Sequence, residues 1–270
     1  MARFLVLALL VCPAFAESGF YLKDQDTVVF YGDSITDQRL YTVATEAYVV
    51  TRFPKLRVKF VHSGWGGDKV SGGGGGDLAT RLKRDVFPYH PTVVTMMLGM
   101  NDGRYRRFDE DIFATFKSGY EKMISMIRQE LPGARLTLIE PSPYDDVTRA
   151  PNFADGYNSV LVQYGAYLRE LARKTENASS ADLNKGVVEM LHRAETADPV
   201  LAKRIINDRV HPGWAGHLIM ATELLKAWNA PKLVTSVEID AKEMADLTLA
   251  IVTINAWNRF GIGFRKMPPA

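Results

Sequence analysis

The sequence is poor in cysteine and has no marked excess of either charge sign. A single thiol, Cys12, allows no disulfide within the chain, so a folded domain must depend on its hydrophobic core. The formal net charge is only +2, with 33 basic and 31 acidic side chains, which gives no basis for binding nucleic acid or an anionic membrane. Hydrophobic residues make up 47% of the chain, which is typical of a globular protein.

Residues 1–16 have the pattern of a secretory signal. Arg3 supplies a positive charge, an apolar run follows at residues 4–11, and Ala14-Phe15-Ala16 has the small residues of a cleavage site. The apolar run is shorter than the roughly 20 residues that a membrane span requires. We therefore predict a cleaved signal peptide at residues 1–16 and a secreted or periplasmic protein. Cleavage would remove the cysteine, and a chain without disulfides suits a bacterial periplasm or exterior.

Apolar runs typical of strands alternate with segments of helical period. The strand-like runs lie at residues 27–31, 58–62, 93–98, 135–139 and, more weakly, 187–190. The helix-like segments lie at residues 41–53, 77–86, 112–131, 156–174 and 215–228. This alternation indicates βαβ units, so we predict an α/β fold with a parallel five-stranded sheet. Residues 232–270 carry no recognisable chemistry; we expect an extension there, with a helix at residues 240–257.

The first strand-like run ends at Gly32-Asp33-Ser34. In α/β sheets, ligands bind in the loops that leave the carboxyl ends of the strands. Ser34 therefore lies where chemistry is usually done. A serine hydroxyl is a weak nucleophile by itself. It needs a base, a group that orients the base, and donors for the oxyanion that forms.

Three further stretches can supply these groups, and they lie at residues 64–68, 99–102 and 208–212. His211 is the best candidate for the base, because Asp208 precedes it by three residues and side chains at this spacing share one face of a helical turn. Asn101 offers a side-chain amide to an oxyanion. The backbone N–H groups of Gly67 and Ser34 could complete the oxyanion hole, since glycine lets the backbone approach a substrate closely.

These residues resemble the blocks of the SGNH hydrolases, also called GDSL-type esterases and lipases. The letters of the name correspond to Ser34, Gly67, Asn101 and His211, in family order, within residues 26–231. The resemblance implies a flavodoxin-like three-layer α/β/α domain over residues 17–231. It implies hydrolysis of esters or thioesters without a metal or another cofactor. It also implies a catalytic triad of Ser34, Asp208 and His211 and an oxyanion hole of Ser34, Gly67 and Asn101.

Other features near these blocks permit more than one interpretation. His62 stands where the family commonly has asparagine. The glycine run 72–76 predicts a pliable loop, and a phosphate-binding role is disfavoured because no Gly-Lys-Ser/Thr sequence follows it. Trp65 either lines the substrate pocket or packs in the core. The scattered histidines and aspartates have no spacing typical of a metal site, so we predict none.

The sequence therefore predicts an exported serine esterase that hydrolyses short-chain, acetyl-type esters of small molecules or of carbohydrate. One alternative is a lipase, thioesterase or lysophospholipase that prefers longer acyl chains. Another is a non-catalytic carbohydrate-binding module on the same fold. The four residues Ser34, Asn101, Asp208 and His211 argue against that module, because binding alone does not need all of them.

Overall fold

The computed structural model describes residues 19–231, and its centre is a parallel sheet of five strands in the order β2-β1-β5-β6-β7. The strands of this sheet are β1 Thr27–Gly32, β2 Lys59–Gly64, β5 Val93–Met97, β6 Arg135–Ile139 and β7 Ala178–Ala181. A separate short antiparallel pair consists of β3 Gly72–Gly73 and β4 Gly76–Asp77. The predicted signal at residues 1–16 and the predicted helix at residues 240–257 lie outside the described residues.

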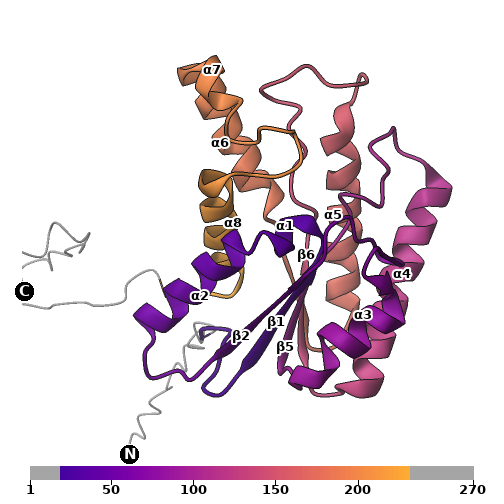
Figure 1. The fold of residues 1–270 in the computed structure, drawn as a ribbon, viewed down its shortest axis with the longest axis vertical. Helices are drawn as coiled ribbons and strands as arrows, with labels where there is room; N and C mark the ends of the chain where they lie inside the picture. Colours follow the sequence, from indigo (N-terminus) through magenta and orange to yellow (C-terminus); the bar gives the residue numbers. More distant parts are fainter. Residues whose placement is uncertain (1–18, 232–270) are drawn as a thin grey trace, which may run out of the picture. The chain divides into compact units, whose positions relative to one another are not determined.

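Helices cover both faces of the sheet. They are α1 Ser34–Asp37, α2 Leu40–Arg52, α3 Leu78–Asp85, α4 Glu110–Glu130, α5 Gly156–Lys174, α6 Asn184–Ala197, α7 Pro199–Ala202 and α8 Trp214–Ala227, with a 3-10 helix η1 at Phe87–Tyr89. Figure 1 shows α2 and α8 on one side of the strands and α3, α4 and α5 on the other. This arrangement confirms the predicted three-layer α/β/α fold. Within residues 19–231, no helix has the length and apolar character needed to span a bilayer.

The middle strands are buried because helices cover both of their faces. Every residue of β5 is buried, as are all residues of β1 and β6 except the first of each. Such strands are continuous apolar runs, which is the reason that the sequence predicts them within one or two residues.

Trp228, at the end of α8, is fully buried and donates its indole N–H to Thr137 Oγ1 of β6 at 3.0 Å. This bond and its ring contacts with Tyr21 and Phe30 anchor the last helix on the sheet.

The prediction of the fifth strand at residues 187–190 is wrong. Those residues belong to α6, where Val187 and Leu191, four residues apart, form part of the buried face. A short apolar run does not distinguish a strand from the inner face of a helix. The strand is instead β7, whose sequence Ala-Ser-Ser-Ala has small side chains and no strand-like pattern. It is an edge strand held by parallel pairing with β6, from Leu136 opposite Ala178 to Ile139 opposite Ala181.

The strand order determines where a ligand can bind. From β1 the chain crosses to β2 on one side, and the later strands β5, β6 and β7 follow on the other. A crevice forms at the carboxyl ends of the two strands where the order reverses, here β1 and β5. Ser34 directly follows β1, and Asn101 lies four residues after the end of β5. The topology alone thus places these two side chains at one end of the sheet.

His217 of α8 is completely buried and links α8 to the start of α2. Its Nδ1 accepts a hydrogen bond from the Tyr41 N–H at 3.2 Å, so the proton on Nε2 faces Gln38 Oε1 at 2.9 Å. Burial lowers the pKa of His217 to about 4, and the nearby imidazole of His211 adds to the shift. His217 is therefore a neutral structural histidine.

We predict that His217 makes stability depend on pH. An unfolded histidine has a pKa of about 6.5, so between pH 6.5 and about 4 only the unfolded chain takes up this proton. The stabilisation is complete above about pH 6.5, and about 3 kcal/mol of it is lost as the pH falls through this range. Denaturant unfolding at about pH 7.5 and pH 5 measures this loss. Between these two pH values, the free energy of unfolding of His217→Gln should fall by about 2 kcal/mol less than that of the wild type.

The control is His192→Gln, which changes an exposed imidazole and should follow the wild type. Burial raises the pKa values of Asp33 and Asp102 to about 7, so these two carboxyls increase stability as the pH falls. Their contribution is the same in all three proteins and cancels in the comparison. An equal acid loss in His217→Gln and the wild type would show that His217 does not carry the effect.

Candidate active site

Ser34 is the first residue of α1, at a sharp turn after β1. Asp33 caps this helix: it is buried and its carboxylate accepts the Ile35 N–H at 3.0 Å. Burial raises the pKa of Asp33 to about 7. A Cβ atom on Gly32 would lie 2.2 Å from Thr36 Oγ1, so only glycine allows the chain to turn back this closely. These contacts fix the backbone on both sides of Ser34.

The structure brings Ser34, His211 and Asp208 together in one hydrogen-bonded chain. His211 Nε2 lies 2.8 Å from Ser34 Oγ, and His211 Nδ1 lies 2.6 Å from Asp208 Oδ2. Because an ionised carboxylate only accepts, the proton of the neutral imidazole is on Nδ1, and Nε2 is free to accept from the serine hydroxyl. Partial burial tends to raise the pKa of Asp208, but hydrogen bonds from the backbone and ring of His211 outweigh it, and the pKa is lowered.

The aspartate and the histidine meet in a loop rather than in a helical turn. The helical turn that the sequence analysis assumed at residues 208–211 is therefore wrong, although the i, i+3 contact forms. Asp208 Oδ1 accepts the N–H groups of Val210 and His211 at 3.0 and 2.8 Å, and Arg209 between them has φ +71°. An aspartate that bonds the backbone two and three residues ahead makes a local turn without helix.

Arg149, in the connection between β6 and α5, fixes the segment that precedes Asp208 through hydrogen bonds. Its guanidinium donates to the carbonyl oxygens of Lys203, Ile206 and Asn207 at 2.9, 3.0 and 2.9 Å. It also forms an ion pair with the buried Asp145 at 2.8 Å. The backbone that leads into Asp208 is thereby fixed through one side chain.

Asn101 follows β5, the neighbour of β1 in the sheet, and its amide is held at both ends. Its Nδ2 donates to the carbonyl oxygen of Asp68 at 3.0 Å, and its Oδ1 accepts the hydroxyl of Tyr105 at 2.8 Å. These two bonds fix which end of the amide is the donor. The second hydrogen on Nδ2 is left for a ligand.

Gly67 belongs to the loop after β2 and has φ +72°. A Cβ atom there would meet nothing within 4 Å, so the backbone conformation, not a lack of space, favours glycine. The next residue, Asp68, is fully buried and accepts from Arg81 Nε at 2.9 Å. Asp68 therefore joins the Gly67 loop to Asn101 through its carbonyl oxygen and to α3 through its carboxylate.

Arg81 is completely buried and bonds the ends of two neighbouring strands, β1 and β2. Its guanidinium donates to the carbonyl oxygens of Gly32 at 3.3 Å and Ser63 at 3.1 Å, and it also pairs with Asp85. Burial tends to lower the pKa of Arg81, but the hydrogen bonds to Asp68 and Asp85 outweigh it, and the pKa is raised. The sequence analysis missed this residue, because an arginine in an amphipathic helix gives no sign of being buried.

The glycine run packs beneath Trp65. Residues 72–77 form the β3–β4 hairpin, and a Cβ atom on Gly75 would lie 2.7 Å from the Trp65 ring and 2.9 Å from the Arg81 side chain. The run is thus a closely packed support of the site. Trp65 itself is 39% exposed and lines a cavity, which agrees with the pocket alternative rather than with burial in the core. His62, also at this cavity, bonds Thr42 Oγ1 at 2.7 Å.

We predict that Arg81→Met lowers the free energy of unfolding by about 3–5 kcal/mol, because it leaves the buried carboxylate of Asp68 without its partner. Denaturant unfolding would measure the loss. Arg84→Met is the matched control: Arg84 pairs with the same Asp85, but its side chain is 45% exposed, so its loss should stay below about 1 kcal/mol. Similar losses in the two variants would contradict the role assigned to Arg81.

Comparison with known proteins finds esterases of similar sequence and fold. An acetylxylan esterase from Geobacillus stearothermophilus is 27% identical over 220 residues, which cover 74% of this chain and 93% of that protein. A solved acetylxylan esterase structure from the same organism has a TM-score of 0.63 at 22% identity and covers 80% of this chain and 99% of its own. A gut microbial diltiazem-metabolizing enzyme is 30% identical with a TM-score of 0.66, over 77% of this chain. The match spans only 48% of that enzyme.

The model of the GDSL-like lipase/acylhydrolase family matches residues 30–219, which is most of the chain and includes Ser34, Gly67, Asn101 and His211. The resemblance found in the sequence is thereby confirmed. The chain belongs to the GDSL-like lipase/acylhydrolase family and is a carboxylic ester hydrolase.

Proposed function

We propose that this protein is an exported serine esterase that removes short acyl groups, acetyl above all, from carbohydrate. The observation that carries the proposal is the continuous hydrogen-bonded chain from Asp208 through His211 to Ser34. Asn101 follows β5, the neighbour of β1 in the sheet, and its amide has a fixed donor end. A nucleophile, a base, a group that orients the base and an oxyanion donor are the parts that acyl transfer requires. The signal-like residues 1–16 support export.

In the first half of the reaction, Ser34 Oγ attacks the ester carbonyl carbon while His211 Nε2 takes the hydroxyl proton. The imidazolium that forms is stabilised by Asp208, which remains ionised because its pKa is lowered. The tetrahedral intermediate then collapses. The alcohol leaves with the proton from His211 Nε2, and the acyl group stays on Ser34.

Negative charge develops on the carbonyl oxygen in this step. The free hydrogen of Asn101 Nδ2 and the N–H groups of Ser34 and Gly67 are the donors that we assign to it. The first N–H groups of a helix have no acceptor within that helix, so the Ser34 N–H at the start of α1 is available. In the second half, His211 takes a proton from water, hydroxide attacks the acyl carbon, and Ser34 is released with its proton.

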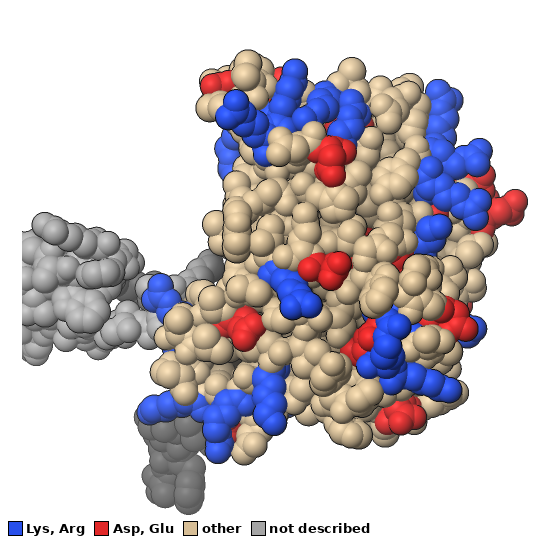
Figure 2. Space-filling model, viewed as in Figure 1, with Lys and Arg blue, Asp and Glu red and all other residues tan. Residues whose placement is uncertain are grey.

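Two observations support a short acyl group on a sugar. The relative with 93% coverage is an acetylxylan esterase. In addition, Tyr105 is held on the Asn101 amide and packs against Tyr144 and Tyr157, with ring centroids at 6.0 and 5.1 Å. We infer that these rings occupy space beside the oxyanion donor that a long acyl chain would need. On the face drawn in Figure 2, basic and acidic side chains are separated by uncharged surface, and the formal net charge is only +2, which suits a neutral polymer better than a polyanion.

The first test uses a fluorophosphonate probe, which bonds covalently to an activated serine. We predict labelling of the wild type and none of Ser34→Ala, whereas Ser118→Ala, which changes an exposed serine of α4, should label fully. Hydrolysis of nitrophenyl esters of increasing acyl length should be fastest for acetate. A maximum at long acyl chains would favour the lipase or thioesterase alternative. Labelling that persists in Ser34→Ala would refute the assignment of the nucleophile.

The second test concerns the oxyanion hole. Asn101→Ala should lower kcat for an aryl acetate by about 10²–10³-fold, equivalent to roughly 3–4 kcal/mol, because one donor to the transition state is lost. Tyr105→Phe removes only the bond to Asn101 Oδ1 and keeps the donor, so its kcat should fall less than about tenfold. If kcat of Asn101→Ala decreases by less than about fivefold, Asn101 has a structural role instead.

A further inference from the structure

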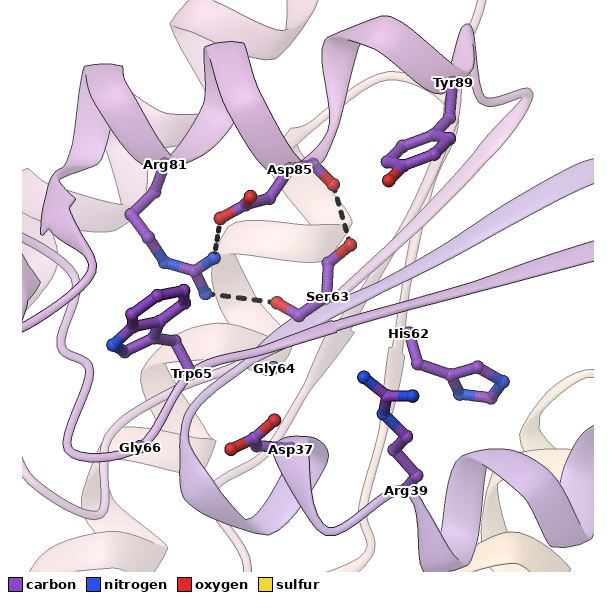
Figure 3. A pocket seen from close by; sticks show the side chains of 10 residues that line it. All are labelled: Asp37, Arg39, His62, Ser63, Gly64, Trp65, Gly66, Arg81, Asp85 and Tyr89. Atoms are coloured by element: carbon purple, nitrogen blue, oxygen red, sulfur yellow. Dashed lines mark hydrogen bonds and ion pairs between the residues drawn. The ribbon is translucent and has the colours of Figure 1, made fainter.

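A cavity of about 360 Å³ lies beside the end of β2 and the end of α1, the helix that begins at Ser34 (Figure 3). Asp37, at the end of α1, forms one wall, and Gly64, Trp65 and Gly66, at and just after the end of β2, form another. These walls touch: a Cβ atom on Gly64 would lie 2.1 Å from Asp37 N. The volume falls within the range of about 300–1,000 Å³ that is usual for small-molecule sites.

Two aromatic side chains give this cavity apolar surface. Trp65 is 39% exposed and Tyr89, from η1, is 47% exposed. Figure 3 shows them on different sides of the space, with the Tyr89 hydroxyl directed toward it. Trp65 is fixed from behind by Gly75 and by the Arg84 guanidinium, 4.7 Å from its ring centroid. Such rings combine an apolar body with a polar tip, which suits ligands that have C–H faces and hydroxyl groups.

Asp37 and Arg39 provide the charged groups that are free to bind. Within residues 19–231, neither side chain has an ion pair or a hydrogen bond, and the side chains of both point toward the open space in Figure 3. Other charged groups of the lining are already engaged: Arg81 pairs with Asp68 and Asp85. A ligand would therefore meet one carboxylate that accepts and one guanidinium that donates.

This pair of opposite charges selects for a neutral polyhydroxy ligand. The Asp37 carboxylate can accept from two hydroxyl groups, and the Arg39 guanidinium can donate to hydroxyl or ring oxygens. A uronate would be attracted by Arg39 and repelled by Asp37, and an amino sugar the reverse, so a single charge gains no net attraction, whereas the hydroxyl groups of a neutral sugar can bond both side chains. We propose that this cavity is a subsite for a neutral sugar ring in the alcohol part of the substrate. The proposal rests on the proposed esterase function in one respect: the bound sugar is part of a substrate only if the protein is an esterase.

The experiment measures binding of unacetylated xylotetraose, which has no ester to cleave, so its result is independent of catalysis. Calorimetry should show binding to the full-length protein, with Kd increased at least about tenfold in Arg39→Gln, the loss expected for a hydrogen bond to a charged group. Arg193→Gln, which changes an exposed and unpaired arginine of α6, should leave Kd unchanged. Tetragalacturonate should bind no more tightly than xylotetraose, because Asp37 offsets the attraction of Arg39 for a uronate.

Tryptophan fluorescence locates the bound sugar. The change on binding xylotetraose should persist in Trp214→Phe, whose ring is exposed at the start of α8, and should be lost in Trp65→Phe. The opposite result would place the sugar beside α8 and overturn the proposal. Absence of xylotetraose binding, or preference for tetragalacturonate, would also overturn it. If the nitrophenyl acetate and fluorophosphonate tests fail while this binding is seen, the esterase function fails and the sugar site stands.

Discussion

The ion pair between Arg81 and Asp68 is the interaction on which the site depends. Asp68 follows Gly67 directly and accepts from Arg81 Nε, while its carbonyl oxygen holds the Asn101 amide. The same guanidinium donates to the carbonyl oxygens of Gly32 and Ser63, at the ends of β1 and β2. A buried ion pair adds little net stability compared with an apolar core, but leaving one member unpaired is costly. The pair therefore acts mainly to specify one arrangement of three loops.

The sheet explains why these loops meet at all. Parallel strands present their carboxyl ends at one edge, and the strand order reverses between β1 and β5, which is where ligands commonly bind in such sheets. Ser34 and Asn101 are separated by most of a βαβαβ unit in the chain, yet both follow strands that are neighbours in the sheet. His211 comes from much later, before α8, and α8 packs against α2, the helix that follows the serine.

What the sequence revealed follows from the same physics. Buried strands such as β1 and β5 are continuous apolar runs, and Ser34, Asn101 and His211 stand in short blocks at strand or helix ends, so both were predictable. β7 was not, because its small residues gain their place from pairing with β6 rather than from their own preference. Arg81 and Arg149 were not predictable either, since both donate to backbone carbonyl oxygens far away in the sequence. For Arg81, nothing in the local sequence separates a buried arginine from one on a solvated helix face.

The two arginines show a common solution to one structural problem. Backbone carbonyl oxygens at the end of a sheet and in the loops beyond it need hydrogen-bond donors, and one guanidinium can bond several of them at once. Arg81 donates to two of them on the oxyanion side, and Arg149 donates to three on the histidine side. A guanidinium has five N–H donors in one plane and keeps its charge when buried, whereas a lysine has three on a flexible stem. Each arginine also has a buried aspartate, Asp68 or Asp145, to balance its charge. The serine is thus held between two rigid supports, and the groups that remain free beside it, such as the second hydrogen on Asn101 Nδ2, are the ones left for a substrate.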